Sequence, residues 1–346
     1  MFTKNFSLLL SLACASTLPA ADKDSKWTWP EGVDAVKYLS AADNTEQNAL
    51  FYKPENKKQV PLLVALHTWS SDYLQPETGY AQWCVAKGWA FIHPDFRGPN
   101  IRPQATGSEL VVEDIVSAVE YAKKNADIDS NRIYLIGASG GGYATLLLAG
   151  RHPEIWAGAS AWVPIFDLEA WHNECKKVGS GYFKGIADSC GGAPGMSKEV
   201  DEQYKKRSAC TYLHKASSVP LDINAGIQDG HKGSVPISHS LMAFNALADA
   251  KDRISDEDIK FMVDKIDVPE HLKKDLSDSL YGKRMPLFRR VSNNARVTIF
   301  QGGHEIIQAA GLTWLEQQRK NSPAVWDFDR KDQAVKFSEK EIQSGK

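Results

Sequence analysis

Apolar runs and amphipathic segments alternate along most of the 346-residue chain. The amphipathic segments have helical spacing, most clearly from Ser108 to Lys124, and the apolar runs have the length of strands. Two of the runs, Pro61 to Leu66 and Ile133 to Ile136, do not alternate with polar residues, which is typical of parallel strands covered on both faces. The pattern predicts an α/β fold with a mostly parallel, eight-stranded sheet and helices on both faces. The predicted strands are Ala35 to Ser40, Ala49 to Lys53, Val60 to His67, Ala90 to Asp95, Arg132 to Gly137, Ala157 to Val163, Leu221 to Gln228 and Arg296 to Gln301.

Two stretches interrupt this alternation. Residues 171–210 are rich in glycine and contain three cysteines, whereas residues 252–290 predict two or three helices. In the second stretch, Pro269 suits a first helical position, and Leu272, Leu276 and Leu280 predict one apolar stripe. We interpret both as lid or cap segments inserted into one domain over residues 22–320, followed by a polar tail at 321–346. A separate small domain is the alternative.

The first 21 residues have the layout of a secretory signal peptide. Lys4 precedes an apolar stretch from Phe6 to Leu18, and Pro19-Ala-Ala-Asp22 follows it. The apolar stretch is too short to span a bilayer, and no later segment is apolar enough to do so. The mature protein is therefore predicted to be secreted or periplasmic, with no membrane association after cleavage.

Export changes the interpretation of the cysteines. Cleavage would leave Cys84, Cys175, Cys190 and Cys210, and four cysteines allow three pairings in an oxidising compartment. We favour a disulfide between Cys175 and Cys190, because their glycine-rich segment looks too irregular to be held by core packing. Cys84 lies in an apolar helical pattern that equally suits a buried free thiol.

Charge and motif content narrow the class of ligand. Forty-one basic and 43 acidic residues give a net charge of −2, and no basic run favours nucleic acid. The sequence contains no Cys-x-x-Cys or His-x-x-x-His spacing, so it predicts neither a metal site nor a cofactor. A small or neutral substrate is the expectation, and the oligomeric state is left open.

The strongest chemical signal is Gly137-Ala138-Ser139-Gly140-Gly141. It follows a predicted strand and precedes a helical pattern, so it matches the Gly-x-Ser-x-Gly nucleophile elbow in its proper setting. The small residues let the backbone make a sharp turn that exposes the Ser139 hydroxyl. The following helix would direct its free N–H groups at the reacting atom, which makes the Gly140 N–H a candidate oxyanion donor.

A catalytic serine needs a base and an orienting acid, and both should follow other strands at the same sheet edge. Asp229 follows the strand that begins at Leu221, and His304 follows the last predicted strand. Asp222 lies at the opposite end of its strand and is excluded. The sequence thus predicts a triad of Ser139, Asp229 and His304 in the chain order of an elbow-borne nucleophile.

Residues that follow the carboxyl ends of other predicted strands are candidates for the rest of the site. The loop after the strand that ends at His67 should supply a second oxyanion donor, the N–H of Thr68 or Trp69. Trp69, Trp162 and Trp171 are candidate substrate-binding residues at this edge, although core packing explains each equally well. His231 is a candidate pocket-wall residue.

These residues resemble the α/β-hydrolase superfamily, and within it the prolyl oligopeptidase-like serine hydrolases and related secreted esterases. The resemblance is carried by Leu66-His67, Asp95-Phe-Arg-Gly98, Asp114, Gly137-Ala-Ser-Gly-Gly-Gly-Tyr143, Arg207-Ser-Ala-Cys-Thr-Tyr-Leu213, Gly226-Ile-Gln-Asp229, Val235-Pro236 and Gly302-Gly-His304. It implies Ser139 as nucleophile, Asp229 as acid and His304 as base.

Three functions are compatible with this sequence. We favour a secreted esterase acting on carbohydrate or polysaccharide esters. An exo-acting serine peptidase would share the triad, but the sequence has no evident Glu-Glu pair to hold a substrate amine. A non-catalytic glycan-binding protein on a hydrolase fold is the third possibility, and the complete triad argues against it.

Overall fold

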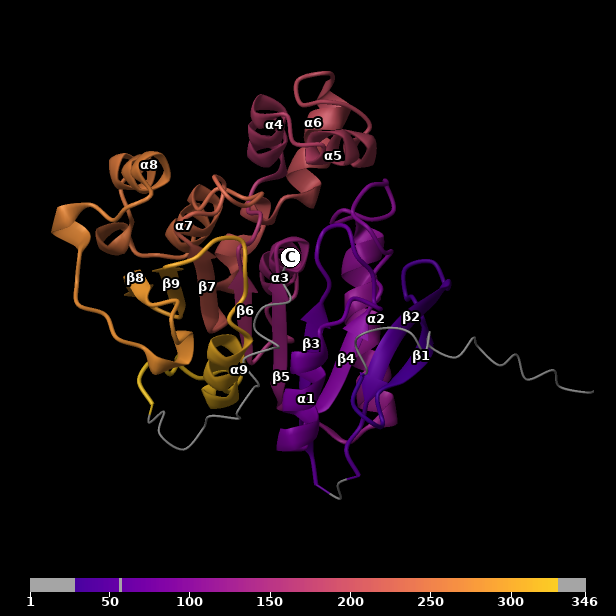
Figure 1. Cartoon of the computed structure of the whole chain (residues 1–346). Coiled ribbons are helices and arrows are strands. Elements are labelled where there is room, and N and C mark those ends of the chain that lie inside the picture. Colours follow the sequence, from indigo (N-terminus) through magenta and orange to yellow (C-terminus); the bar gives the residue numbers. More distant parts are fainter. Residues whose placement is uncertain (1–28, 56–57, 329–346) are drawn as a thin grey trace, which may run out of the picture.

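A single twisted sheet forms the centre of the molecule. A computed structural model describes residues 29–55 and 58–328, so the predicted signal peptide and residues 329–346 of the predicted tail lie outside the described residues. The strand order is β1-β2-β4-β3-β5-β6-β7-β9-β8 (Figure 1). The strands are β1 (Asp34–Leu39), β2 (Glu46–Tyr52), β3 (Val60–Leu66), β4 (Ala90–Pro94), β5 (Ile128–Ala138), β6 (Gly158–Trp162), β7 (Leu221–Gly226), β8 (Pro286–Ser292) and β9 (Ala295–Phe300).

The inner strands are parallel, and the outer ones are antiparallel. Strands β4, β3, β5, β6, β7 and β9 pair in parallel, whereas β1, β2 and β8 join in antiparallel pairs. Every residue of β3, β4, β6, β7 and β9 is buried, as expected for strands covered on both faces. The predicted mostly parallel α/β sheet is therefore confirmed.

The sheet contains one strand more than the eight that were predicted. Strand β8 begins within the stretch that was interpreted as helical, and it pairs with β9 alone. In that stretch Leu272 and Leu280 lie in separate short 3-10 turns, Glu270–Leu272 and Ser279–Tyr281, and not on one helical stripe. The leucines have helix-like spacing, but among the described residues of this stretch the only α-helix is α8 (Asp256–Lys265).

Helices cover both faces of the sheet. α1 and α9 contact each other in front of the sheet, and α2 and α3 lie behind it (Figure 1). α2 begins after Ser108, whose side chain accepts the Val111 N–H at 3.3 Å, so the predicted helix from Ser108 is confirmed. The helices are α1 (Thr78–Lys87), α2 (Glu109–Asn125), α3 (Gly140–Arg151), α4 (Leu168–Val178), α5 (Tyr182–Cys190), α6 (Lys198–Arg207), α7 (Ser238–Asn245), α8 (Asp256–Lys265) and α9 (Gln308–Gln317).

The glycine-rich stretch at residues 171–210 is part of a cluster of three helices. α4, α5 and α6 pack together above the carboxyl ends of the strands (Figure 1), and they bury Trp171, Ile186 and Tyr204. All four cysteines from Cys84 onwards are free thiols, so the expected disulfide between Cys175 and Cys190 is absent from the structure. The buried side chains of the three helices pack this segment on the body, so the bridge is not shown and stays a prediction.

Within residues 29–55 and 58–328, no helix is long and apolar enough to cross a membrane. The described part of the predicted tail docks on the body. Trp326 stacks on Trp314 of α9 with ring centroids 5.4 Å apart, and the Val325 N–H donates to Gln318 at 2.9 Å.

Candidate active site

Ser139 occupies a sharp turn between β5 and α3. Its φ of 56° and ψ of −118° form a combination that L-residues rarely adopt. The turn is anchored at both sides, because the Ser139 N–H donates to the Trp162 carbonyl at 2.9 Å and the Tyr143 N–H donates to the Ser139 carbonyl at 2.8 Å. The predicted nucleophile elbow is therefore present.

Glycines permit this turn because neighbouring backbones lie against it. A Cβ at residue 137 would collide with the backbone of Gly141, and a Cβ at residue 141 would collide with the carbonyl of Leu66. The backbone of α3 can thus approach β3 and β5 more closely than any side chain would allow.

Asp229 and His304 form a hydrogen-bonded pair at the same sheet edge. They follow β7 and β9, which are neighbours, and the ladder continues beyond the strands because the Gln228 N–H donates to the Gly302 carbonyl at 2.9 Å. His304 Nδ1 lies 2.8 Å from Asp229 Oδ2. Asp229 Oδ1 accepts the N–H groups of Gly230 at 2.9 Å and Val235 at 3.2 Å. These bonds fix the buried carboxylate, so the imidazole donates from Nδ1 and keeps a lone pair on Nε2.

Asp222 has a different role, as the sequence indicated. It lies at the other end of β7, where it accepts the Arg296 Nε–H at 2.7 Å in a buried ion pair. It is therefore remote from the edge that carries Asp229.

The loop that follows β3 and carries Thr68 and Trp69, here called the oxyanion loop, has only one of the two predicted N–H donors available. The Thr68 N–H already donates to the side-chain oxygen of Gln75 at 2.8 Å. Within the described residues the Trp69 N–H has no acceptor. A Cβ on Gly140 would collide with the backbone nitrogen of Trp69, so the two peptide groups lie side by side. Trp69 and Gly140 are thus the pair with N–H groups available for an oxyanion.

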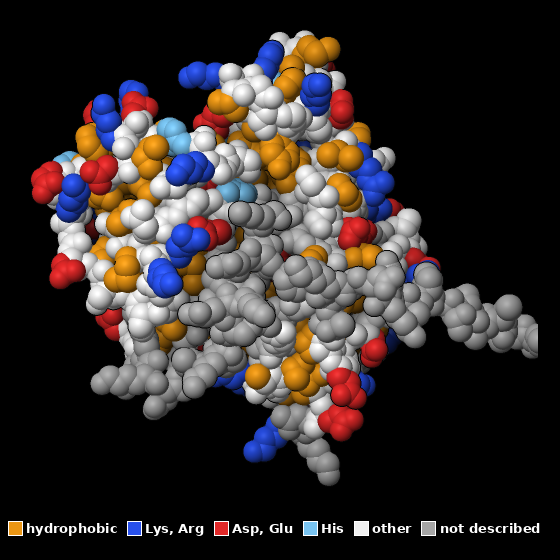
Figure 2. Space-filling model, viewed as in Figure 1, with side chains coloured by type: hydrophobic (Ala, Val, Ile, Leu, Met, Phe, Trp, Pro, Cys, Tyr) orange, Lys and Arg blue, Asp and Glu red, His pale blue; other side chains and the backbone are white. Residues whose placement is uncertain are grey.

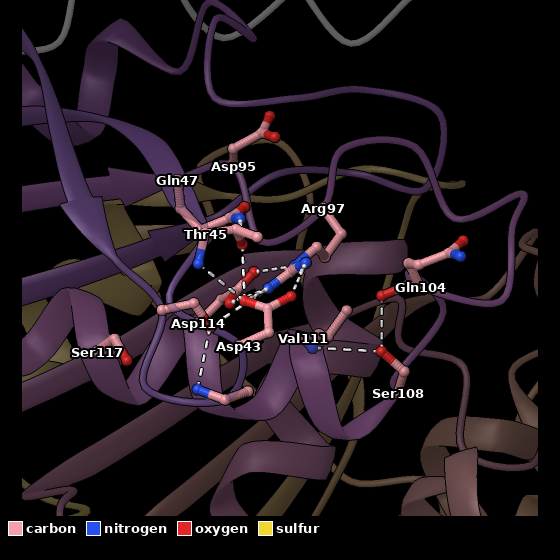
Figure 3. A network of polar contacts seen from close by, with 12 residues as sticks. Asp43, Thr45, Gln47, Asp95, Arg97, Gln104, Ser108, Val111, Asp114 and Ser117 are labelled. Atoms are coloured by element: carbon pink, nitrogen blue, oxygen red, sulfur yellow. Dashed lines mark hydrogen bonds and ion pairs between the residues drawn. The ribbon is translucent and has the colours of Figure 1, made fainter.

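The loop after β4 holds Trp69 from the other side. The Asn100 N–H and side-chain amide donate to the Trp69 carbonyl at 2.8 and 3.3 Å. Arg97 fixes this loop through paired contacts to Asp114 at 2.6 and 2.9 Å and to Asp43 at 2.8 and 3.0 Å (Figure 3). The hydrogen bonds to Asp114 and Asp43 raise the pKa of Arg97, and the bond from Arg97 lowers the pKa of Asp43. Three separate segments are thereby tied to the oxyanion loop.

A partly buried carboxylate lies behind Gln75. Glu77 accepts the side-chain amide of Gln75 at 2.5 Å and that of Gln308 at 2.8 Å. Within the described residues no cation lies within salt-bridge distance of it, and burial raises its pKa to about 7.

A cavity of about 200 Å³ adjoins the oxyanion loop. It is lined by Trp69, Ser70, Ile101, Gly181, Tyr182 and Gly185. Trp171 lies behind this wall, where its ring meets Trp69 edge-on at 4.7 Å and stacks on Tyr182 at 5.2 Å. Figure 2 shows hydrophobic side chains gathered where the α4–α6 cluster meets the body of the molecule.

Two predicted substrate-binding residues lie elsewhere. Trp162 is fully buried, donates to Ser160 Oγ at 2.8 Å and packs on Phe300, because the pleat of β6 directs its ring into the core. His231 is exposed and contacts the Val263 carbonyl at 2.7 Å, so its loop directs it towards α8 and away from the cavity lining.

Several site residues were not predicted from the sequence, namely Gln75, Asn100, Tyr182 and Ser234. They lie in loops or at the start of α5 and belong to no motif, so no local signal distinguished them. No group of three or more potential metal ligands occurs in the part of the chain that the structure describes.

A nucleophile elbow on a mostly parallel sheet, with the acid and histidine after later strands, defines the α/β-hydrolase fold. Solved structures share this fold. The structure of a puromycin hydrolase matches 82% of this chain and 37% of its own, with a TM-score of 0.56 and 15% identity. A Mycobacterium tuberculosis puromycin-hydrolyzing peptidase matches 68% of this chain and 38% of its own, with a TM-score of 0.51 and 18% identity.

The chain belongs to the prolyl oligopeptidase family, whose model matches residues 79–265, and it is accordingly a serine hydrolase. An acetylxylan esterase of Coprinopsis cinerea is 27% identical over 136 residues, which is 36% of each protein. Dipeptidyl-peptidase 5 of Porphyromonas gingivalis is 36% identical over 78 residues, 22% of this chain and 10% of the peptidase. The chain thus matches about a third or less of the length of these relatives.

Proposed function

We propose that this serine hydrolase cleaves carboxylic esters through an acyl-enzyme. His304 takes the proton of Ser139, the Ser139 oxygen attacks the ester carbonyl, and Asp229 stabilises the imidazolium that forms. The N–H groups of Gly140 and Trp69 hold the oxyanion. Protonation of the alcohol by His304 then releases it, and water cleaves the acyl-enzyme with the same base.

One observation supports an ester more than a peptide with a free amine. The cavity next to Trp69 is lined by aromatic, aliphatic and small polar residues, and none of its lining residues carries a charge. A substrate amine that entered such a cavity would lose its hydration without gaining a carboxylate partner. A neutral acyl or sugar group has no such cost.

Carbohydrate esters are the substrate class that we favour. The acetylxylan esterase is similar over part of the chain, and the N-terminal sequence has the layout of an export signal. The net charge of −2 also suits a neutral polymer better than a polyanion.

The mechanism is tested with Ser139→Ala. This variant should lose hydrolysis of p-nitrophenyl acetate and release of acetate from acetylated xylan, and it should resist labelling by a fluorophosphonate. Ser130→Ala, at an exposed position near the start of the same strand, is the matched control and should retain wild-type rates. Wild-type turnover by Ser139→Ala would reject the mechanism, and a wild-type protein that takes no label would support the non-catalytic glycan-binding alternative.

A peptidase is the second candidate because of the match to dipeptidyl-peptidase 5. Matched acetyl ester and aminoacyl amide substrates with the same chromophore separate the two functions. We expect kcat/KM to be higher for the ester, and a higher value for the amide would reverse the assignment.

We propose that the protein is exported and acts outside the cytoplasm, as a secreted or periplasmic enzyme. Mass spectrometry of the chain expressed in a secreting bacterium should give a mature N-terminus near Ala21 or Asp22. An intact N-terminus in the cell pellet would contradict this proposal.

A further inference from the structure

A second serine contacts the imidazole that the proposed mechanism uses as its base. Ser234 Oγ lies 3.3 Å from His304 Nε2. Within the described residues no hydrogen bond joins the Ser139 hydroxyl to His304. The nitrogen that must receive the Ser139 proton is therefore paired with another hydroxyl in this structure.

The loop that carries Ser234 is packed directly on the Asp229–His304 pair. Val235, the next residue, donates its N–H to Asp229 Oδ1 at 3.2 Å. A Cβ on Gly233 would lie 2.5 Å from the Cβ of His304. Because residue 233 has no side chain, the loop can place the Ser234 hydroxyl against the ring.

The positions of the protons give the direction of this hydrogen bond. His304 Nδ1 lies against a carboxylate, so this nitrogen carries the hydrogen and Nε2 presents a lone pair. The Ser234 hydroxyl therefore donates to Nε2. A lone pair that accepts this hydrogen cannot at the same time accept the proton of Ser139.

Trp171 connects Ser234 to the cavity wall. The Trp171 indole N–H donates to the Ser234 carbonyl at 2.8 Å. The same ring contacts Trp69 and Tyr182, both of which line the cavity. A substrate group in the cavity would contact Trp69 and Tyr182. Both of these rings touch Trp171, which holds the Ser234 backbone.

We propose that Ser234 is a cap on the catalytic base: its hydroxyl occupies the lone pair of His304 Nε2 in the resting enzyme and yields it to Ser139 when substrate fills the cavity. This inference rests on the proposed function. In the capped state Ser234 O–H donates to Nε2. On release the hydroxyl rotates away with its bonds intact, and the Ser139 O–H takes its place. The Ser139 O–H bond then breaks, its proton moves to Nε2, its oxygen bonds to the carbonyl carbon, and the carbonyl π pair becomes the oxyanion.

The test measures the reactivity of Ser139 towards a small fluorophosphonate, which reacts without filling the cavity. Ser234→Ala should raise the second-order labelling rate about 2- to 10-fold, the range that one net hydrogen bond allows. Ser234→Thr keeps the hydroxyl and should label at close to the wild-type rate. Ser238→Ala, the same substitution at the start of α7, is the matched control and should leave the rate unchanged.

A pH profile separates capping from a structural role. The Ser234 hydroxyl contacts Nε2, the atom that gains the proton, so the acid limb of kcat/KM should move in Ser234→Ala. Asp229, the charged group that contacts His304, is unchanged in these variants. Trp171→Phe, which loses the indole N–H but keeps an aromatic ring, should also label faster than wild type.

The outcomes are distinct. An unchanged or slower labelling rate in Ser234→Ala, with the acid limb in its wild-type place, would overturn the cap while leaving the esterase proposal intact. A wild-type protein that neither labels at Ser139 nor hydrolyses esters would overturn the proposed function, and the cap with it.

Discussion

At the scale of single residues, the site depends on two peptide groups that approach each other closely. The Gly140 backbone lies against the backbone of Trp69, and Gln75 already uses the neighbouring Thr68 N–H. The sequence predicted Gly140 and left Thr68 and Trp69 as alternatives. It could not choose between them, because the choice depends on a glutamine side chain whose position is set by tertiary structure.

Gly140→Ala tests this arrangement. The added Cβ would collide with Trp69 and displace its N–H from the oxyanion position. We expect kcat for p-nitrophenyl acetate to fall about 10²- to 10³-fold, as when one oxyanion donor is removed. The far-ultraviolet circular dichroism spectrum should be retained, and a kcat within threefold of wild type would contradict the assignment of this donor pair.

At the scale of elements, the inner strands and the elbow were predictable from the sequence, because continuous apolar runs mark buried parallel strands. Strand β8 was missed because it follows a segment with helix-like leucine spacing, and because Arg289 and Arg290 interrupt the apolar run that marks the inner strands. The contacts of Ser234 and Asn100 could not be predicted from local sequence patterns either, because each residue contacts a partner that is distant in the sequence.

Arg207, a buried cation, holds the α4–α6 cluster to the loop formed by residues 103–106. Arg207, at the end of α6, donates to the carbonyls of Pro103 at 3.0 Å, Ala105 at 2.9 Å and Thr106 at 3.2 Å. Arg207 thereby joins the α4–α6 cluster to the loop that carries Ile101, a residue that lines the cavity.

Arg207→Met should reduce the free energy of unfolding by about 2 to 4 kcal/mol, because it removes the charge-assisted hydrogen bonds from Arg207 to the carbonyls of Pro103, Ala105 and Thr106. Urea unfolding measures this loss. Lys206→Met changes the exposed neighbour on the same helix and should cost less than about 0.5 kcal/mol. Equal losses in the two variants would show that the carbonyl contacts of Arg207 do not fasten the cluster.

At the scale of the whole molecule, Glu77 joins distant parts of the chain. It lies at the start of α1, accepts an amide from Gln308 of α9, and supports the oxyanion loop through Gln75. Burial raises its pKa from 4.5 to about 7. Between these two pH values the folded chain keeps a proton that the unfolded chain has lost, so this group makes stability fall as pH rises.

Glu77→Gln should reduce that fall. We expect the wild-type protein to lose more stability than the variant between about pH 5 and 7.5 in urea unfolding at a series of pH values. Glu202→Gln, at an exposed position on α6, should follow the wild-type curve. Parallel curves for wild type and Glu77→Gln would contradict the raised pKa of Glu77.

The two ends of the sheet also limit how copies of the chain can meet. β1 and β8 each have one strand neighbour, and an open strand edge is a template for another chain. β1 carries Asp34 and Lys37 on exposed positions, whereas Arg289 and Arg290 of β8 are half-buried and Arg289 is ion-paired with Asp278 at 3.0 Å. A second copy that tried to extend the sheet at β1 would have to strip water from Asp34 and Lys37, so the charges of β1 oppose edge-to-edge aggregation there.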